Sequence, residues 1–336
     1  MNLARRIAVF SQLGDHIERI LLERPNALFQ KAILENPWFT TENVALALTG
    51  IRKFLHKEAL TQWTSSYPLE PSQEKTIGVA MAGNIPLVGF HDFLCVLISG
   101  HRLKAKMSSQ DSILLTDLAN RLMEIDATTR DSIQFSDRLH EVEAVIATGS
   151  DNTARYFEYY FRDIPHLIRK NRASCAVILG DESPDELKAL GTDVFSYFGM
   201  GCRNVSKLYV PEKYDFTKLF QAWDQFGKIL HHSRYLNNYQ YQKSVILVNK
   251  TVFFDNGFIL LKEEDALVSP VSVLYFERFT DQEDLLKKVK KNEPKIQCTV
   301  SARNRFNGSE AFGQSQFPEV SDYPDKVDTV NFLIGL

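Results

Sequence analysis

The chain has 336 residues, of which 44% are hydrophobic and 24% charged, proportions typical of a globular protein long enough to form two domains. Its 39 Lys and Arg residues against 42 Asp and Glu residues give a formal net charge of -3, which excludes a global positive field for nucleic acid or an anionic membrane. A ligand that carries phosphate would therefore need a local basic cluster.

The sequence predicts neither a signal peptide at its N-terminus nor a membrane span. The apolar run that begins at Ile7 breaks at Ser11, which is too early for a signal peptide. The most apolar segment, residues 85–100, contains His91 and Asp92 and is shorter than the ~20 residues that a membrane span needs. We therefore expect a cytoplasmic protein.

Residues 1–70 carry apolar side chains at helical spacing and predict an N-terminal helical segment, followed by a connector at residues 66–75. Strand and helix then alternate. Strands are predicted at residues 76–82, 102–107 and 142–150, and helices at residues 87–99, 112–125 and from residue 152 onward. This βαβαβ pattern predicts a parallel sheet that binds ligands at the carboxyl ends of its strands.

A second α/β domain is expected from about residue 173. Its predicted elements are strands at residues 174–180, 206–210, 244–250, 258–262, 272–279 and 297–302, with a helix at residues 184–198.

Cys202 is the cysteine most suited to chemistry. It lies between glycines and an apolar run in FSYFGMGCRNVSKLYVP, where Gly199 and Gly201 leave room for a ligand near its sulfur. The other cysteines lie in apolar or strand-like stretches and are expected in the core; these are Cys95, Cys175 and Cys298. No CxxC pair occurs, which argues against a zinc site and a disulfide framework.

Three predicted strand ends carry small or polar residues: GNIP at residues 83–86, KMSSQ at residues 106–110 and TGS at residues 148–150. No GxGxxG fingerprint accompanies them. Lys106 and backbone N–H groups could hold a phosphate there, and the Asn84 amide could stabilise an oxyanion. Local sequence alone equally allows a solvated Lys106 and a capping or turn-forming Asn84.

In order and spacing, GNIP, KMSS, TGS and GMGCRN resemble elements of the aldehyde dehydrogenase superfamily. Within it, YFGMGCRNVSKLYVP and DYPDKVDTVNFLIGL are most similar to the LuxC-type acyl-CoA reductases. The resemblance implies an aldehyde-dehydrogenase-like α/β fold with a Rossmann-like parallel-sheet cofactor domain and an α/β catalytic domain. The implied divisions are residues 1–70, 71–172, 173–318 and a C-terminal segment, 319–336, that returns to the first domain.

The resemblance also implies residue roles. Cys202 would be the acylated nucleophile and Asn84 the oxyanion donor. The implied cofactor contacts are Lys106 and Ser109 near the adenosine ribose, and Thr148, Gly149 and Ser150 near the pyrophosphate.

One departure from the superfamily concerns water activation. Matching its glutamate-containing stretch to LIRKNRASCAVIL places Ile168 where hydrolytic members have a general base, which favours a reductase over an aldehyde oxidase. The segment IRKNR, residues 168–172, is interpreted as a charged connector or as a contact for CoA or cofactor phosphates.

Another departure concerns the cofactor. Ser109 stands where NAD-preferring members have a glutamate, which favours NADPH, with Lys104 or Arg102 expected to help bind the 2′-phosphate. The stretch EEDALVSP leaves open whether Glu264, Asp265 or neither contacts the nicotinamide ribose.

The sequence thus predicts an NADPH-dependent acyl-CoA reductase that needs no metal and releases an aldehyde, fatty by resemblance. The alternatives are an acyl transferase and a non-catalytic acyl-binding subunit of a fatty acid reductase complex. Expected partners are the acyl-CoA substrate, acyl-transferase or acyl-activating proteins and a second copy in a homodimer, and no nucleic acid. Acyl chain length and the choice between CoA and carrier-protein thioesters stay open.

Overall fold

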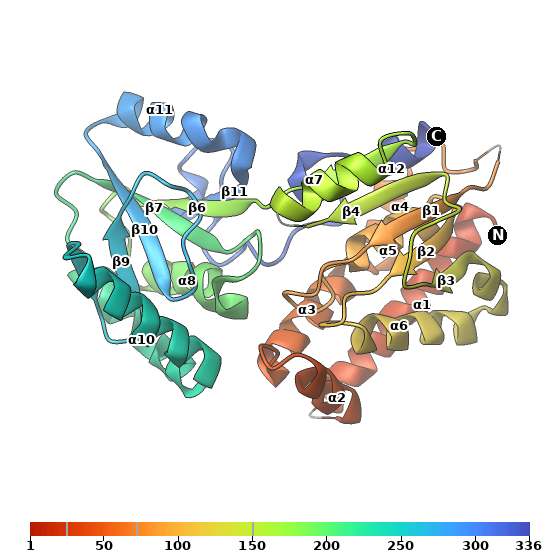
Figure 1. The fold of residues 1–336 in the computed structure, drawn as a ribbon, viewed down its shortest axis with the longest axis horizontal. Helices are drawn as coiled ribbons and strands as arrows, with labels where there is room; N and C mark the ends of the chain where they lie inside the picture. Colours follow the sequence, from red (N-terminus) through yellow and green to blue (C-terminus); the bar gives the residue numbers. More distant parts are fainter. Residues whose placement is uncertain (25, 72, 150) are drawn as a thin grey trace. The chain divides into compact units, whose positions relative to one another are not determined.

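The computed structural model describes residues 1–24, 26–71, 73–149 and 151–336, which form two compact units (Figure 1). The first unit comprises Met1–Asn171 and Pro318–Leu336, and the second comprises Arg172–Phe317. Among the described residues, no helix combines the length and the apolar character that crossing a membrane requires.

The first unit is built on a five-stranded sheet of order β3-β2-β1-β4-β5, in which all pairs are parallel. Its strands are β1 (Thr76–Ala80), β2 (Arg102–Lys106), β3 (Ile133–Phe135), β4 (Ala144–Thr148) and β5 (His166–Arg169). The parallel sheet expected from the sequence is therefore confirmed. The strand order reverses between β1 and β4, which is where open sheets of this kind bind ligands.

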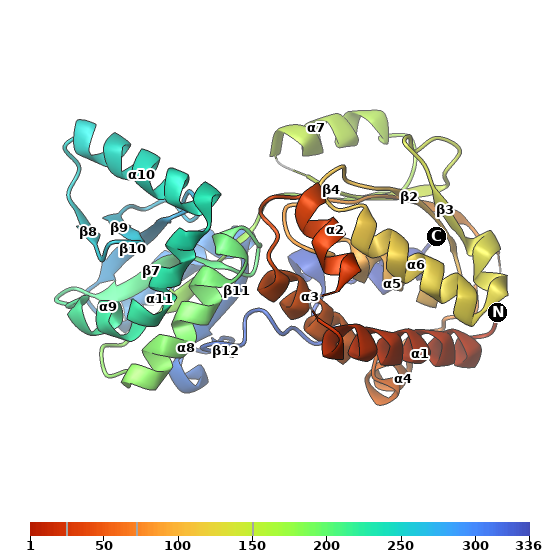
Figure 2. The same cartoon turned by 90° about the horizontal axis from the view of Figure 1, so that it is seen from below.

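Helices cover both faces of this sheet. They are α1 (Leu3–Leu22), α2 (Ala27–Glu35), α3 (Thr41–Phe54), α4 (Lys57–Thr64), α5 (Phe90–Ile98), α6 (Ile113–Ile125), α7 (Asp151–Tyr160) and α12 (Thr329–Ile334). Alternate strand residues face opposite sides, so Ile146 packs in the large core with α1 to α6 while Val145 and Ala147 pack against Phe157 of α7. Figure 2 shows α7 on one side of the sheet and α1, α5 and α6 on the other.

The second unit contains a seven-stranded sheet of order β12-β11-β6-β7-β10-β9-β8, in which the β8–β9 pair is antiparallel and the other pairs are parallel. The strands are β6 (Ala173–Val177), β7 (Val205–Pro211), β8 (Phe253–Asp255), β9 (Leu260–Glu263), β10 (Val273–Phe279), β11 (Ile296–Ser301) and β12 (Glu310–Ala311). Its helices are α8 (Pro184–Phe195), α9 (Thr217–Trp223), α10 (Ser233–Val248) and α11 (Gln282–Asn292). In Figure 1, α11 lies above this sheet and α8 below it.

The strand predicted at residues 244–250 is wrong, because α10 continues to Val248. Its β-branched residues suggest a strand locally, but His232 caps the helix and Tyr235, Tyr239 and Ile246 bury one helical face. Packing of that face outweighs local propensity. The helix predicted at residues 184–198 ends at Phe195, where a 3-10 helix, η2 (Ser196–Gly199), follows.

The interpretation of IRKNR as a connector is also wrong for Arg169, which ends β5 and is 2% exposed. Its Nη2 donates to Asp92 Oδ1 and to Thr329 Oγ1, each at 2.7 Å, and its Nη1 donates to Pro324 O at 2.7 Å. Arg169 therefore joins β5 and α5 to the C-terminal segment Pro318–Leu336 within the first unit.

Candidate functional site

The carboxyl ends of β2, β1 and β4 form a continuous edge in the first unit. The register pairs Ala80 of β1 with Lys106 on one side and with Ala147 on the other. Lys106 and Thr148, which end β2 and β4, therefore flank the start of the loop that carries Asn84. These are the three strand ends that the sequence singled out.

The loop after β1 is held at both sides of Asn84. A Cβ atom at Gly83 would lie 2.5 Å from Ser108 Oγ, so the backbone packs directly on the turn after β2. Asn36 Nδ2 donates to Gly83 O at 3.1 Å, and the backbone N–H of Leu87 donates to Asp111 Oδ2 at 2.6 Å. Asn84 is exposed between these anchors, on a loop whose position is fixed by the turn that carries Ser109.

Lys106 and Ser109 are both exposed. Among the described residues, the Lys106 ammonium makes no ion pair or hydrogen bond, so it is available to a phosphate or a ribose hydroxyl. The exposed turn residues beside it, Ser109 and Gln110, carry no charge, so no carboxylate there would repel a 2′-phosphate.

The expectation that Arg102 assists Lys106 is wrong. Arg102 begins β2 and Lys106 ends it, so about 13 Å of strand separates their backbones at roughly 3.3 Å per residue. Arg102 faces Glu74 at 3.9 Å. The buried Lys104 donates to His140 O at 2.7 Å and is held by that contact.

The turn after β4 packs closely on α7. A Cβ atom at Gly149 would lie 2.9 Å from Thr153 Cβ, so a side chain there would disturb the packing. The Gly149 N–H donates to Arg169 O at 3.3 Å and therefore extends the pairing with β5. Ser150, predicted beside the pyrophosphate, lies outside the described residues.

Cys202 lies in the second unit, in the turn that connects η2 with β7, and its side chain is exposed. The backbone before it passes through three successive left-handed residues, Tyr197 (φ 50°), Phe198 (φ 58°) and Gly199 (φ 79°). This conformation is costly for the two aromatic residues and favours glycine at the third position. The sequence predicted the exposed thiol, but not the left-handed aromatic pair.

Asn204 fixes the cysteine turn, a role that the sequence analysis missed. Its Oδ1 accepts the Gly201 N–H at 2.8 Å, and its Nδ2 donates to Asp193 O at 3.0 Å and to Ser196 O at 2.7 Å. One side chain thus links α8, η2 and the turn. An asparagine two residues beyond the cysteine was the available signal, since asparagine often bonds to nearby backbone in turns.

Ser174 and Cys298 lie beneath the same turn. Ser174 Oγ is 3.0 Å from Cys202 O and 3.0 Å from Cys298 Sγ. Burial raises the pKa of Cys298 to about 12, which leaves its thiol protonated at neutral pH. Cys95, Cys175 and Cys298 are all buried, as expected for core cysteines.

The residues matched to the superfamily's acidic positions form structural contacts. Ile168 packs in the apolar cluster with Phe157 of α7. Glu264 pairs with Lys262 at 2.8 Å, and Asp265 pairs with Lys291 at 3.3 Å. Among residues 1–24, 26–71, 73–149 and 151–336, no group of three His, Cys, Asp or Glu side chains is arranged to hold a metal.

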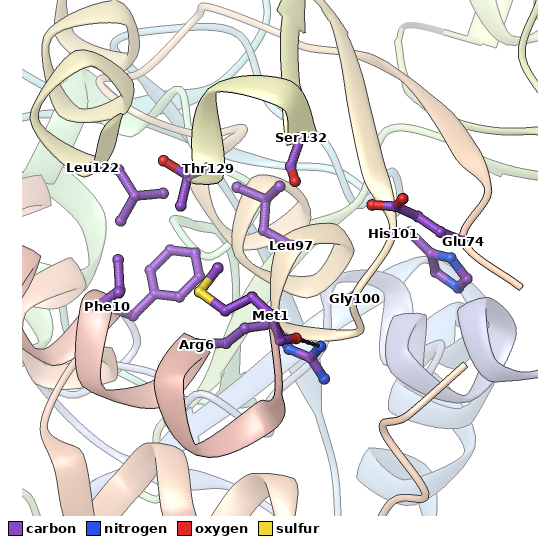
Figure 3. Close-up of a pocket in the computed structure, with 11 residues that line it drawn as sticks. Met1, Arg6, Phe10, Glu74, Leu97, Gly100, His101, Leu122, Thr129 and Ser132 are labelled. Carbon is purple, nitrogen blue, oxygen red and sulfur yellow. Dashed lines mark hydrogen bonds between the residues drawn. The ribbon is translucent and has the colours of Figure 1, made fainter. Parts of the chain in front are cut away.

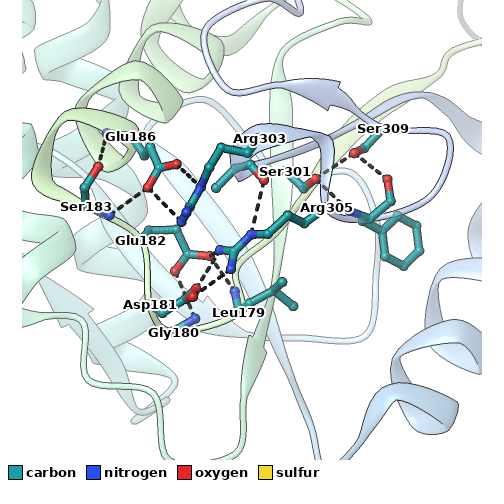
Figure 4. Close-up of polar contacts among 12 residues, drawn as sticks. Leu179, Gly180, Asp181, Glu182, Ser183, Glu186, Ser301, Arg303, Arg305 and Ser309 are labelled. Carbon is teal, nitrogen blue, oxygen red and sulfur yellow. Dashed lines mark hydrogen bonds and ion pairs between the residues drawn. The ribbon is translucent and has the colours of Figure 1, made fainter.

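Two further polar regions lie away from these residues. A cavity in the first unit is bordered by Arg6, Phe10, Glu74 and His101 and lies at the amino ends of β1 and β2 (Figure 3). In the second unit, Arg305 pairs with Asp181 and Arg303 with Glu186 beyond the carboxyl ends of β6 and β11 (Figure 4). These arginines are held by carboxylates and stabilise the loops.

No model of a known protein family matches the sequence, and no curated protein matches it. Solved structures do resemble it. Aldehyde dehydrogenase 21 from Physcomitrella patens, in complex with the reaction product succinate, aligns with a TM-score of 0.71 and 13% identity over 100% of this chain and 84% of that one. The NAD+ complex of an aldehyde dehydrogenase from Bacillus cereus aligns with a TM-score of 0.64 and 14% identity over 90% of this chain and 72% of that one.

A third similar structure is the glyceraldehyde-3-phosphate dehydrogenase GapN from Methanocaldococcus jannaschii complexed with NADP, with a TM-score of 0.65 and 13% identity over 91% of this chain and 77% of that one. The shared architecture confirms the predicted α/β fold class. The chain has the fold of the aldehyde dehydrogenases.

Proposed function

We propose that the protein is an acyl-CoA reductase that carries its acyl group on Cys202 and uses NADPH to release an aldehyde, fatty by the sequence resemblance. The observation that carries the proposal is the exposed Cys202 thiol in a turn fixed by Asn204. Similar folds with bound NAD+ or NADP support a nicotinamide-dependent oxidoreductase.

In the first step, the Cys202 thiolate attacks the carbonyl carbon of the acyl-CoA thioester. A carbon–sulfur bond to Cys202 forms, the bond to CoA breaks, and the departing CoA thiolate takes a proton from solvent. The Asn84 amide is the proposed donor to the tetrahedral oxyanion, and its loop is held by Asn36 and Asp111 before substrate binds.

The exposed Lys106, the uncharged Ser109 turn and the close Gly149 turn are compatible with a dinucleotide along the strand ends. We propose that Lys106 and Ser109 hold the adenosine ribose and that Thr148, Gly149 and Ser150 border the pyrophosphate. Bound NADPH would supply the hydride that reduces the thioester carbonyl. With one proton from solvent, the carbonyl becomes a thiohemiacetal on Cys202, whose carbon–sulfur bond breaks to release the aldehyde and restore the thiol.

Ile168 supports reduction over hydrolysis. An apolar side chain packed against α7 cannot activate water, so the acyl group would remain on Cys202 until hydride or CoA arrives. A small pocket lined by Phe198, Gly199 and Val205 adjoins the cysteine turn and offers apolar contacts beside it.

The test is intact mass spectrometry after incubation with palmitoyl-CoA and without nicotinamide. Wild type should gain one acyl group, Cys202→Ala none, and the matched control Cys298→Ala should behave as wild type because Cys298 is buried. Adding NADPH should discharge the adduct as aldehyde. An adduct that passes only to CoA or a carrier protein would select the transferase, and no adduct with any chain length would select the binding subunit.

A further inference from the structure

The cavity at the amino ends of β1 and β2 lies at the opposite edge of the sheet from the proposed cofactor contacts (Figure 3). Helices α1, α5 and α6 supply its apolar wall, which consists of Val9, Phe10, Leu97 and Leu122. Its polar wall contains Arg6, Glu74, His101, Thr129 and Ser132. The cavity volume is about 40 Å³. At roughly 10–15 Å³ for one water molecule, this admits one small organic molecule and no nucleotide.

Arg6 brings a buried positive charge to this cavity, and its side chain is 5% exposed. Its Nη1 donates to Met1 O at 2.6 Å and its Nη2 donates to Leu69 O, both of which are neutral carbonyl groups. The ion pair with Glu70 is long, 3.8 Å from Nη2 to Oε1, and the Glu70 side chain is 64% exposed. That same oxygen also accepts the Leu3 N–H at 2.8 Å. The charge of Arg6 is therefore only weakly compensated within the protein.

One N–H group of the same guanidinium has no acceptor. Arg6 Nε is buried, and among the described residues it has no hydrogen-bond partner. A buried donor without an acceptor is unfavourable, and more so when it belongs to a charged group. The half-buried Ser132 hydroxyl also forms no hydrogen bond within the part of the chain that the structure describes. The polar wall thus offers two donors to a ligand, one of them cationic.

The other groups on this wall use their donors within the protein. His101 Nε2 donates to Leu333 O at 3.2 Å, so Nδ1 accepts the Lys75 N–H at 3.3 Å and the ring is neutral. Burial lowers the pKa of His101, in agreement with a neutral ring. Thr129 Oγ1 donates to the backbone carbonyl of Asp126 at 2.7 Å. Arg6 Nε and Ser132 Oγ therefore determine which ligand binds.

We propose that this cavity binds a short-chain monocarboxylate of the size of acetate or propionate. One carboxylate oxygen accepts the Arg6 Nε–H and the other accepts the Ser132 hydroxyl, while the alkyl end contacts Phe10 and Leu122. The Glu74 carboxylate on the same wall repels a second negative charge, which favours a monoanion over a dianion such as phosphate. The ligand joins α1 to η1 (Ala127–Ser132) and takes no part in the chemistry proposed at Cys202.

The experiment measures binding of propionate to the full chain by saturation-transfer NMR at neutral pH, with propionamide as the uncharged control. Wild type should transfer saturation to propionate and much less to propionamide, because only the carboxylate compensates Arg6. Arg6→Met should weaken propionate binding at least about ten-fold. The matched variant Arg19→Met, which changes an exposed arginine of the same helix outside the cavity, should bind as wild type. Thermal melting verifies that each variant is folded.

Three outcomes would overturn the proposal: no transfer to propionate in wild type, equal transfer to propionamide, or unchanged propionate binding in folded Arg6→Met. If Arg6→Met fails to fold, Ser132→Ala decides, because it removes only a half-buried hydroxyl. Propionate binding about ten-fold weaker in Ser132→Ala supports the proposal, and wild-type binding overturns it. These measurements use neither acyl-CoA nor nicotinamide, so their result is independent of the proposed reductase activity.

Discussion

Asp111 is a buried acid beneath the Asn84 loop, and it should make stability depend on pH. Burial raises its pKa to about 7, although the bond from the Leu87 N–H opposes this. Among the described residues, its Oδ1 has no hydrogen-bond partner. The folded protein therefore holds this proton more tightly than the unfolded chain, and the free energy of unfolding should fall as pH rises from about 4 to about 7.

Asp111→Asn should remove this dependence and keep an acceptor for the Leu87 N–H. One pKa unit corresponds to about 1.4 kcal/mol. Above pH ~7, the free energy of unfolding of the variant should therefore exceed that of wild type by a few kcal/mol at most, and this difference should vanish at acidic pH. Urea unfolding across this pH range measures it, with the exposed Asp137→Asn as control. Parallel curves for Asp111→Asn and wild type would contradict the assignment.

Asn84 can be tested separately from the thiol. If its amide stabilises the oxyanion, Asn84→Ala should lower aldehyde formation about 100- to 1000-fold. Alkylation of Cys202 by iodoacetamide should stay at the wild-type rate, because that reaction forms no tetrahedral oxyanion. Equal rates of aldehyde formation in variant and wild type would mean that Asn84 only shapes the turn.

At the scale of elements, the C-terminal segment depends on the buried pair between β5 and α5. Arg169→Met would leave Asp92, with a side chain 8% exposed, without its cation, at an expected cost of about 3–5 kcal/mol in the free energy of unfolding. The double variant Arg169→Met with Asp92→Leu should recover much of this loss. Urea unfolding of both variants measures these changes. If the single and double variants lost the same free energy of unfolding, Arg169 would stabilise the fold through contacts other than Asp92.

Asn204 connects α8, η2 and the start of β7, so Asn204→Ala should loosen the cysteine turn. Losing the three hydrogen bonds of this buried side chain should cost about 1–3 kcal/mol in the free energy of unfolding. Hydrogen exchange at the Gly201 N–H should accelerate more than exchange in strand β9, which does not pair with β7. Unchanged protection at Gly201 would mean that the turn is held by the left-handed residues before it.

The elements that the sequence predicted correctly are those whose signal is local. The apolar runs of β1 and β4 are buried on both faces, and their ends meet because parallel strands share one edge. β5 was missed because Arg169 interrupts the apolar pattern of the strand, and Asp92, which pairs with Arg169, is 77 residues away in sequence. For the same reason, the bond from Arg203 Nη1 to Glu310 Oε1, 107 residues away, could not be found from residues near Cys202.

At the scale of the whole molecule, cofactor binding should stabilise the fold. A ligand at one hundred times its dissociation constant adds about 2.7 kcal/mol, so NADPH should raise the melting temperature, and more than NADH at equal concentration. Lys106→Ala should reduce the rise, whereas Arg102→Ala, at the other end of β2, should not. If Lys106→Ala and Arg102→Ala changed the rise in melting temperature equally, the nucleotide would bind away from the carboxyl end of β2.

The first unit is assembled from two stretches of chain, Met1–Asn171 and Pro318–Leu336, and the second unit is encoded between them. During translation, the second unit is therefore complete before the ribosome makes Thr329, the partner of Arg169. Until residues 318–336 are made, the buried guanidinium of Arg169 lacks two of its acceptors, Pro324 O and Thr329 Oγ1. The first unit can reach its final form only after residues 318–336 have been made, so a chain that terminates before them should be recognised by chaperones and proteases.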